Sequence, residues 1–312
     1  MKKYISIGYI ITLTSVTLLN ISISLAENRG NNITSTNLSS SRNLPINTNG
    51  VSVLLVSDET DGVDNPQFFD AYYIQALTSY NIAYSFWDHD LNGSPKLSDL
   101  EPYKLIIWFT ANSGQYSSDT AHYGHITLTL EEEKTLNDYL TTLDGDRGLI
   151  LSGMWIAWNC VANASNNTQE YSTLFSGLLG LDYPVDNFTN WINVNNDWDL
   201  KGEASSPIFK SKTYGVEWKS SKNNPDMLES NLNGGDTKWF YKDNYHHFAC
   251  IHNEGDKMIG GKFRIALMSC PFEAVGSTDD KKNVMKNILD WCKLPSVSIE
   301  NTSIGEIKSL FH

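Results

Sequence analysis

The sequence predicts an α/β fold: a parallel sheet with helices on both faces and an antiparallel β insertion before the last strand. Short apolar runs, each long enough for a strand buried on both faces, alternate along the chain with segments of helical periodicity. This alternation predicts right-handed crossovers, which place successive strands parallel in one sheet. The rhythm breaks at residues 181–261, where short strand-like segments lie between turns rich in Asn, Gly and Pro. Such a pattern is typical of antiparallel strands.

The predicted elements follow one another in a regular order. Apolar runs predict strands at residues 51–56, 82–87, 105–110, 149–151 and 263–268. Helical periodicity predicts helices at residues 66–77, 129–143, 168–179 and 277–291. Thr129 and Glu132 have the spacing of a capping box, and Ser277 with Asp280 marks the start of the last helix.

The first 26 residues have the composition of a signal peptide. Lys2 and Lys3 precede a mostly apolar stretch, and Ser24-Leu25-Ala26 fits the small-x-small cleavage rule. The alternative is an uncleaved N-terminal anchor, although the apolar stretch is short for a membrane span. We therefore expect a secreted or periplasmic protein with no membrane span after cleavage. The rest of the chain is predicted to form a disordered linker, one domain and a polar tail, at residues 27–50, 51–294 and 295–312.

The net charge of the chain and the spacing of its cysteines exclude one class of partner and one class of metal site. The chain carries a formal net charge of −13, and such a surface repels phosphate backbones, so we expect no nucleic-acid partner. None of the four cysteines has the C-x-x-C spacing of a zinc site. Disulfides and buried thiols both stay open for Cys160, Cys250, Cys270 and Cys292.

Five segments occur in an order that resembles a known domain. They are Val53–Asp58, Tyr84–Asp88, Leu105–Thr110, Gly148–Gly153 and Cys270–Ala274. Together they resemble the flavodoxin-like, class I amidotransferase-like domain of exported bacterial proteins, which is found beside proteases of the immune inhibitor A type. The resemblance covers residues 51–294, nearly all of the predicted mature chain. It implies a flavodoxin-like sheet and export, and it brings no settled activity.

The turn after the fourth predicted strand is the place where such folds raise a nucleophile on a sharp strand-to-helix elbow. Met154 occupies this position, and its thioether cannot attack a carbonyl carbon. Glu273 follows the last strand without a histidine beside it, and Cys160 lies six residues beyond the elbow. The Cys-His-Glu triad of an amidotransferase is therefore absent, and we predict no catalytic residue. A carboxylate such as Glu273 is also stabilised simply by a nearby helix N-terminus.

Ligands of open parallel sheets bind outside the carboxyl ends of the strands. Residues that follow or end the predicted strands are therefore the candidates for a ligand-binding edge: Asp58, Thr110, Met154 and Glu273.

A metal site is a second candidate. The residues Asp88, Asp90, Asn92 and Asp99 match most of a calcium-binding loop. The match departs from the pattern because a strand enters the loop and because Asp stands at the last ligand position. The alternative is an Asx-type turn, since these residues are also turn formers. We expect no cofactor other than calcium here, and we interpret the histidines, including His122, His125, His246 and His247, as loop or surface residues rather than zinc ligands.

Four tryptophans in or near the insertion form a possible aromatic platform: Trp191, Trp198, Trp218 and Trp239. Aromatic faces stack on sugar rings and on apolar groups of proteins. The alternative, which we favour, is that they close the core of a small β-rich unit. The ligand of such a platform would be a protein or a carbohydrate.

Two functions follow as hypotheses. The first, which we prefer, is an exported non-catalytic binding or accessory module on an amidotransferase-like scaffold, a pseudoenzyme. The second is a hydrolase that uses a metal or carboxylate site at the carboxyl edge of the sheet. Converged, partly buried carboxylates or histidines at that edge would favour the enzyme. An edge plugged by Met154 and Trp155 would favour the module.

Overall fold

The computed structural model describes residues 52–58, 69–111, 127–157, 160, 173–182, 198–218, 225–230, 237–241 and 244–294. All of them belong to the second of two units into which the chain divides, Asn47–His312. The predicted signal peptide, linker and C-terminal tail lie outside the described residues. None of the described helices is long and apolar enough to cross a membrane.

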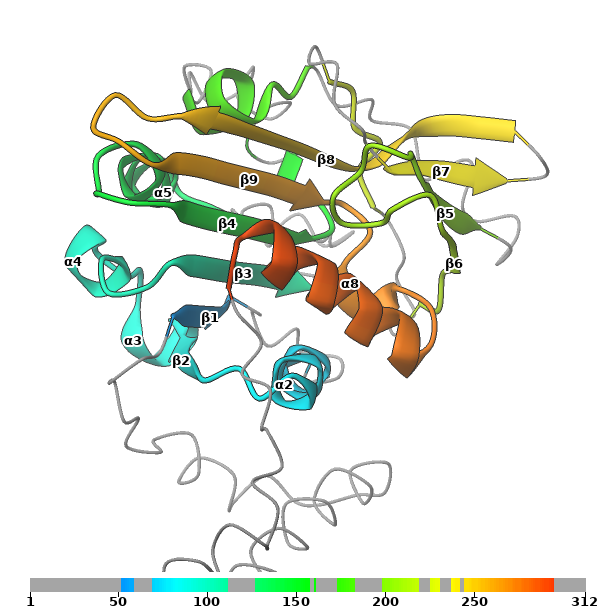
Figure 1. Ribbon diagram of the computed structural model, residues 1–312, viewed down its shortest axis with the longest axis horizontal. Coiled ribbons are helices and arrows are strands. Elements are labelled where there is room, and N and C mark those ends of the chain that lie inside the picture. Colours follow the sequence, from blue (N-terminus) through cyan, green and yellow to red (C-terminus); the bar gives the residue numbers. More distant parts are fainter. Residues whose placement is uncertain are drawn as a thin grey trace, which may run out of the picture. The chain divides into compact units, whose positions relative to one another are not determined.

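The described strands form one nine-stranded sheet, and half of it is parallel (Figure 1). The parallel strands lie in the order β2-β1-β3-β4-β9, with every neighbouring pair parallel. Their bounds are β1 Val53–Ser57, β2 Tyr84–Asp88, β3 Leu105–Ala111, β4 Arg147–Gly153 and β9 Lys262–Met268. These match the five strands that the apolar runs predict, so the parallel core is confirmed.

The other half of the sheet is antiparallel, as predicted for the insertion, but it belongs to the same sheet, which is therefore mixed rather than parallel. The order continues from β9 as β8-β7-β5-β6, and each of these pairs is antiparallel. The strands are β5 Asp199–Gly202, β6 Thr213–Gly215, β7 Thr237–Tyr241 and β8 Asn244–Asp256. The insertion therefore extends the same sheet. The cause is the turn between β8 and β9, where Gly260 and Gly261 take φ values of +95° and +80° and return the chain directly along β9.

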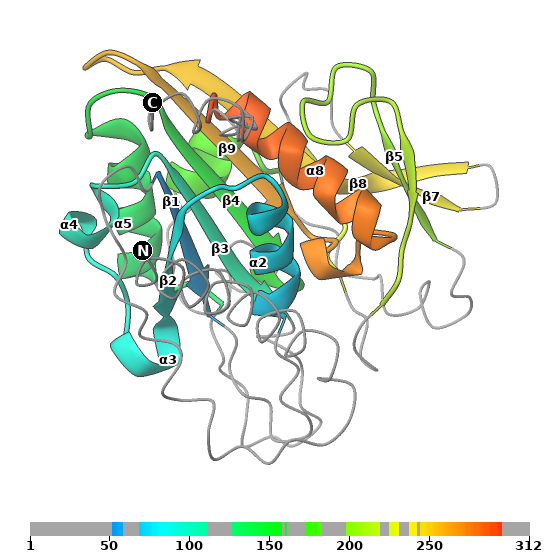
Figure 2. The ribbon, with the colours of Figure 1, turned by 60° about the horizontal axis from the view of Figure 1, so that its bottom comes forward.

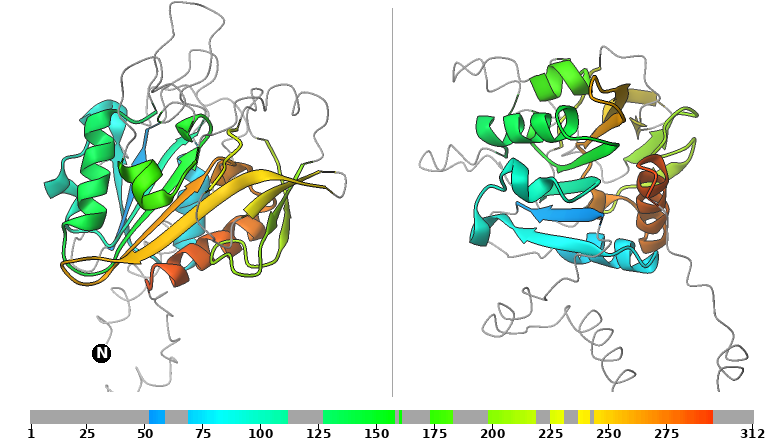
Figure 3. Two further views of the ribbon diagram at one scale, coloured as in Figure 1. Left: turned by 90° about the horizontal axis from the view of Figure 1, so that it is seen from above. Right: turned by 60° about the vertical axis from the view of Figure 1, so that its left-hand side comes forward.

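Helices cover both faces of the sheet (Figures 2 and 3). On one face α2 (Asp70–Ser79) and α8 (Thr278–Trp291) pack over one apolar cluster. On the other, α5 (Leu130–Thr141), the π-helix η3 (Thr173–Leu179) and α4 (Leu97–Leu100) pack over a second cluster. Alternate strand residues enter alternate clusters, because successive side chains of a strand point to opposite faces.

Two helices begin where their caps predict. The Thr129 Oγ accepts a hydrogen bond from the Glu132 N–H at 3.3 Å, and the Thr129 N–H donates to Glu132 Oε2 at 2.7 Å. Ser277 and Asp280 make the same reciprocal pair at the start of α8. Such local patterns fix a helix start regardless of tertiary context.

The four cysteines are buried, and none of them forms a disulfide within the described part of the chain. Of the two alternatives that the sequence leaves open, the buried thiol is the one observed.

Candidate functional site

The elbow after β4 is closed by two large side chains. The positive φ of +69° falls on Trp155 rather than on Met154, so the strained position of the turn lies one residue later than the sequence indicates. A non-glycine residue in this conformation costs about 1–3 kcal/mol, which the surrounding packing must hold. Met154 is only 2 % exposed and Trp155 only 7 %. The turn geometry of a nucleophile elbow is present, and neither side chain at it is a nucleophile.

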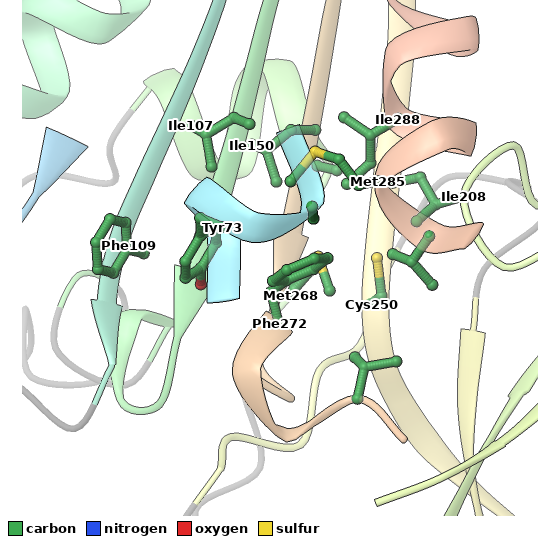
Figure 4. Packing of buried hydrophobic residues seen from close by; sticks show 14 of the residues in the cluster. Tyr73, Ile107, Phe109, Ile150, Ile208, Cys250, Met268, Phe272, Met285 and Ile288 are labelled. Atoms are coloured by element: carbon green, nitrogen blue, oxygen red, sulfur yellow. The ribbon is translucent and has the colours of Figure 1, made fainter. Parts of the chain in front are cut away.

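A buried polar network lies at the carboxyl ends of β4 and β9. The Tyr73 hydroxyl lies 2.8 Å from Ser152 Oγ and 3.0 Å from Glu273 Oε2. The Phe272 N–H donates to Ser152 Oγ at 2.9 Å. Tyr73 itself is held between aromatic rings, with centroids 4.3 Å from Phe109 and 4.8 Å from Phe272 (Figure 4). The network therefore ties α2, β4 and the 3₁₀ turn η4 (Phe272–Ala274) together inside the core.

Glu273 is the acid that an amidotransferase triad would use, but its surroundings give it another role. Burial raises the pKa of Glu273 to about 7, against the lowering effect of its hydrogen bonds and of Lys281. Glu273, Ser152 and Tyr73 are all buried, so none of them offers a surface to a ligand in this arrangement. Of this network the sequence identifies only Glu273. Ser152 precedes the elbow and Tyr73 lies on a distant helix, so no motif connects them.

A second polar cluster, the Asp58–His89–Glu132 cluster, lies at the carboxyl ends of β1 and β2. His89 stands at the first position of the short helix α3 (His89–Asn92), which directly follows β2. Its Nδ1 lies 3.1 Å from Asp58 Oδ1, and its Nε2 lies 2.7 Å from Glu132 Oε1. Asp58 follows β1 and Glu132 lies in the first turn of α5. Each nitrogen of the imidazole therefore lies within hydrogen-bond distance of a carboxyl group.

Two further side chains complete the cluster. The Trp108 Nε1–H donates to Asp58 Oδ2 at 3.0 Å from the neighbouring strand β3. The Ser94 Oγ donates to Glu132 Oε1 at 2.6 Å and lies 3.4 Å from His89 Nε2. Ser94 is exposed and His89 partly so, while Asp58 and Glu132 are buried. The cluster thus reaches from the core to the surface.

Each of the three titratable groups of the cluster has a pKa that its neighbours or its burial shift. Burial alone would raise the pKa of Glu132, but hydrogen bonds from His89, Ser94 and Thr129 outweigh it and lower that pKa to about 2. The hydrogen bond to Glu132 raises the pKa of His89, and Asp58 and Asp90 add to this effect. Burial raises the pKa of Asp58 to about 7 although His89 and Trp108 oppose it. The carboxyl groups at its two nitrogens therefore stabilise the protonated imidazole of His89.

Sequence reasoning identifies Asp58 in this cluster and misses the others. His89 and Glu132 are 43 residues apart, and only the adjacency of β1 and β2 with the start of α5 brings them together. The available signal was position: Asp58 and His89 each lie two residues after a predicted parallel strand, and such positions share one edge of the sheet.

The other ligand-edge candidates are also placed. Thr110, the penultimate residue of β3, is fully buried, and its hydroxyl has no hydrogen-bond partner in the part of the chain that the structure describes. Together with Asp58, Met154 and Glu273, it lies in the interior rather than on an open surface. Their role as ligand contacts stays a prediction.

Two of the predicted calcium residues, Asp88 and Asp99, serve as helix caps. Asp88 Oδ1 accepts the Leu91 N–H at 3.2 Å, and Asp99 Oδ2 accepts the Lys96 N–H at 2.9 Å. The Asn92 amide donates to the Asp88 carbonyl. Among the described residues, no group of three or more His, Cys, Asp or Glu side chains could hold a metal ion. These are the turn roles that the sequence leaves as the alternative to calcium.

The tryptophan platform is only partly visible. Trp198 is buried, and Trp218 packs partly buried against the same apolar cluster. Trp191 lies outside the described residues, and Trp239 is described only by its backbone in β7. The loop histidines His122 and His125 also lie outside the described ranges, and the side chains of His246 and His247 are not described.

Comparison with known proteins gives likenesses of fold. No family model and no curated protein matches the chain. Among solved structures, it resembles the cytoplasmic protein STM3548 from Salmonella typhimurium at 10 % identity and a TM-score of 0.45, over 77 % of this chain and 98 % of that one. A ThuA-like protein from Bacteroides uniformis is 11 % identical with a TM-score of 0.40, over 77 % and 91 % of the two chains. At these values we take no function from them.

The predicted secreted or periplasmic location is corrected here. Two of the similar structures, STM3548 and STM1381 from Salmonella typhimurium, are named cytoplasmic proteins. The prediction relied on the signal-peptide pattern of residues 1–26, which lie outside the described residues, and on the resemblance to a domain of exported proteins. Export is not carried further.

Proposed function

We propose that the chain is a non-catalytic binding or accessory module on an amidotransferase-like scaffold. The observation that carries the proposal is the burial of Met154 and Trp155 at the turn where such scaffolds present their nucleophile. Glu273, the acid of the expected triad, is bonded to Tyr73 instead of to a histidine. The scaffold has the turn and the acid of an amidotransferase site, but it has neither a nucleophile at the turn nor a histidine bonded to the acid.

The flavodoxin-like assignment belongs to the same proposal. The strand order β2-β1-β3-β4-β9 is the 2-1-3-4-5 order of flavodoxin-like sheets when the fifth parallel strand is β9. The antiparallel strands β8, β7, β5 and β6 then extend that sheet beyond its last parallel strand. This supports a flavodoxin-like core with an added antiparallel wing.

A panel of amide substrates tests the proposal. Purified protein should hydrolyse neither glutamine nor simple aryl amides at neutral pH, with or without added divalent metals. Glu273→Gln keeps the size of the side chain and removes its acid, so it is the matched variant. Amide turnover by the wild type that is lost in Glu273→Gln would show that the elbow site works and would overturn the proposal.

The ligand that we propose for the module is a protein or a carbohydrate. Trp198 is buried and Trp218 packs partly buried against the core, so the other two platform candidates, Trp191 and Trp239, are the ones to test. A carbohydrate ligand predicts that oligosaccharides quench or shift tryptophan fluorescence and that Trp239→Ala reduces the response. Trp198→Phe, at a buried position, is the control that should keep it. A flat titration in the wild type excludes the carbohydrate and leaves the protein ligand.

The second candidate function is a hydrolase acting through a carboxylate site. The specific observation that favours it is the convergence of Asp58, His89 and Glu132 at one corner of the carboxyl edge. Separated pKa values within one cluster are typical of acid and base pairs. Hydrolysis that depends on Asp58 but not on Glu273 would distinguish this candidate from an active elbow.

A further inference from the structure

The exposed end of the Asp58–His89–Glu132 cluster has the connectivity of an acyl-transfer site. Ser94 Oγ lies 3.4 Å from His89 Nε2, and His89 Nδ1 lies 3.1 Å from Asp58 Oδ1. A hydroxyl facing one imidazole nitrogen, with a buried carboxyl group at the other, is the serine–histidine–acid arrangement that activates a serine. It is recognised by geometry and not by order in the chain.

We propose that Ser94, His89 and Asp58 form a masked serine hydrolase site, with Glu132 as the group that masks it. The inference rests on the second candidate function, the hydrolase, and gives residues to it, so its confirmation would replace the non-catalytic module. Ser94 is the nucleophile, His89 the base and Asp58 the group that orients the imidazole. None of the three belongs to the elbow after β4.

Glu132 keeps the site in its resting state by geometry. Its Oε1 lies 2.7 Å from His89 Nε2 and accepts a hydrogen bond from the Ser94 hydroxyl at 2.6 Å. The serine therefore donates to a carboxylate whose low basicity prevents it from taking the proton. The imidazole nitrogen that should receive the proton is occupied by the same oxygen. The separation of 3.4 Å between Ser94 and His89 is long for a working pair, as expected when another acceptor stands between them.

The substrate class follows from the chemistry of an activated serine. Its hydroxyl attacks the carbonyl carbon of a carboxylic ester, whose leaving alkoxide needs only the proton that His89 returns. Ser94 contacts the first turn of α5 through Glu132, and the dipole at the start of a helix favours the negative charge that develops on oxygen.

The reaction balances without any further reactant. Ser94 Oγ forms a bond to the carbonyl carbon while its proton passes to His89 Nε2. The bond from the carbonyl carbon to the alkoxide oxygen then breaks, and His89 returns the proton to the leaving alcohol. Water repeats both steps on the acyl-serine and releases the carboxylic acid.

Labelling with a fluorophosphonate tests the proposal without a known substrate, because this probe phosphonylates an activated serine and releases fluoride. In the wild type, labelling of Ser94, read by mass spectrometry, should rise with pH as His89 loses the proton that Asp58, Glu132 and Asp90 stabilise. Glu132→Ala removes the masking oxygen and should raise the labelling rate at pH 8 about 100-fold, the scale of general-base assistance. It should also move the pH midpoint downward.

The controls separate masking from damage to the helix start. Thr129→Ala removes half of the same cap but keeps Glu132 on His89, so it should label like the wild type. Ser94→Ala and His89→Ala should abolish labelling in the Glu132→Ala background. The proposal is overturned if folded Glu132→Ala is not labelled at Ser94, or if labelling does not require His89. If Glu132→Ala does not fold, the wild-type pH series decides, since no label at Ser94 up to pH 10 contradicts the proposal. Amide turnover that survives Ser94→Ala would instead overturn the binding-module function.

Discussion

Glu273 and Asp58 are buried carboxyl groups whose pKa values burial raises to about 7. A folded-state pKa above the unfolded value means that the stabilisation is complete below about pH 4 and is lost as the pH rises through 7. Glu132 has the opposite sign: its pKa is lowered to about 2, so its stabilisation is present above about pH 4.5 and is lost on acidification. We therefore expect the free energy of unfolding to peak in mildly acidic solution and to fall toward pH 8.

Glu273→Gln tests this at a single position. The amide keeps an acceptor for the Tyr73 hydroxyl and cannot ionise. The free energy of unfolding, measured with urea at pH 4 and at pH 8, falls between these values in the wild type. In the variant this fall should be smaller by about 3 kcal/mol. Parallel pH profiles for the two proteins would show that Glu273 does not titrate as a buried acid.

At the scale of elements, Lys257 connects the β8–β9 turn to the loop that follows α5. Its Nζ donates to the Leu143 carbonyl at 2.7 Å and also to the Gly145 carbonyl. Both carbonyls belong to the loop between α5 and β4, beyond the C-cap Thr142, so Lys257 joins this loop to the β8–β9 turn. Lys257→Met should therefore lower the free energy of unfolding by about 1–3 kcal/mol in urea melts.

Lys262→Met is the control for that variant. Lys262 Nζ lies 3.5 Å from the exposed Asp256 carboxylate, a surface pair worth at most about 1 kcal/mol. If both variants lowered the free energy of unfolding equally, the hydrogen bonds of Lys257 would stabilise the fold no more than a surface ion pair does.

The segment from α3 to α4 carries the calcium prediction. Because Asp88 and Asp99 accept backbone N–H groups as caps, we expect millimolar Ca²⁺ to leave the Tm unchanged. A rise in Tm that Asp90→Ala abolishes would restore the calcium site, since a ligand that binds only the native state stabilises it.

For the whole molecule, features that depend on local sequence could be predicted, and features that depend on contacts between distant segments could not. The five parallel strands and the cap of α5 depend on neighbouring residues, so the sequence predicts them. The extension of the sheet through β8 depends on its pairing with β9, and the cluster around His89 depends on three elements meeting at one corner. Burial of Met154 likewise depends on packing around the turn and not on the turn sequence itself.

The central claim is that the elbow of this scaffold is closed. Thiol labelling of Met154→Cys in the folded protein, compared with Met258→Cys at the tip of the β8–β9 turn, tests it directly. Met154 is 2 % exposed and Met258 is fully exposed, so the two cysteines should differ in rate by orders of magnitude. Slow labelling at position 154 that becomes fast only in denaturant is the predicted result. Rapid labelling at position 154 under native conditions would show an open elbow and contradict the account.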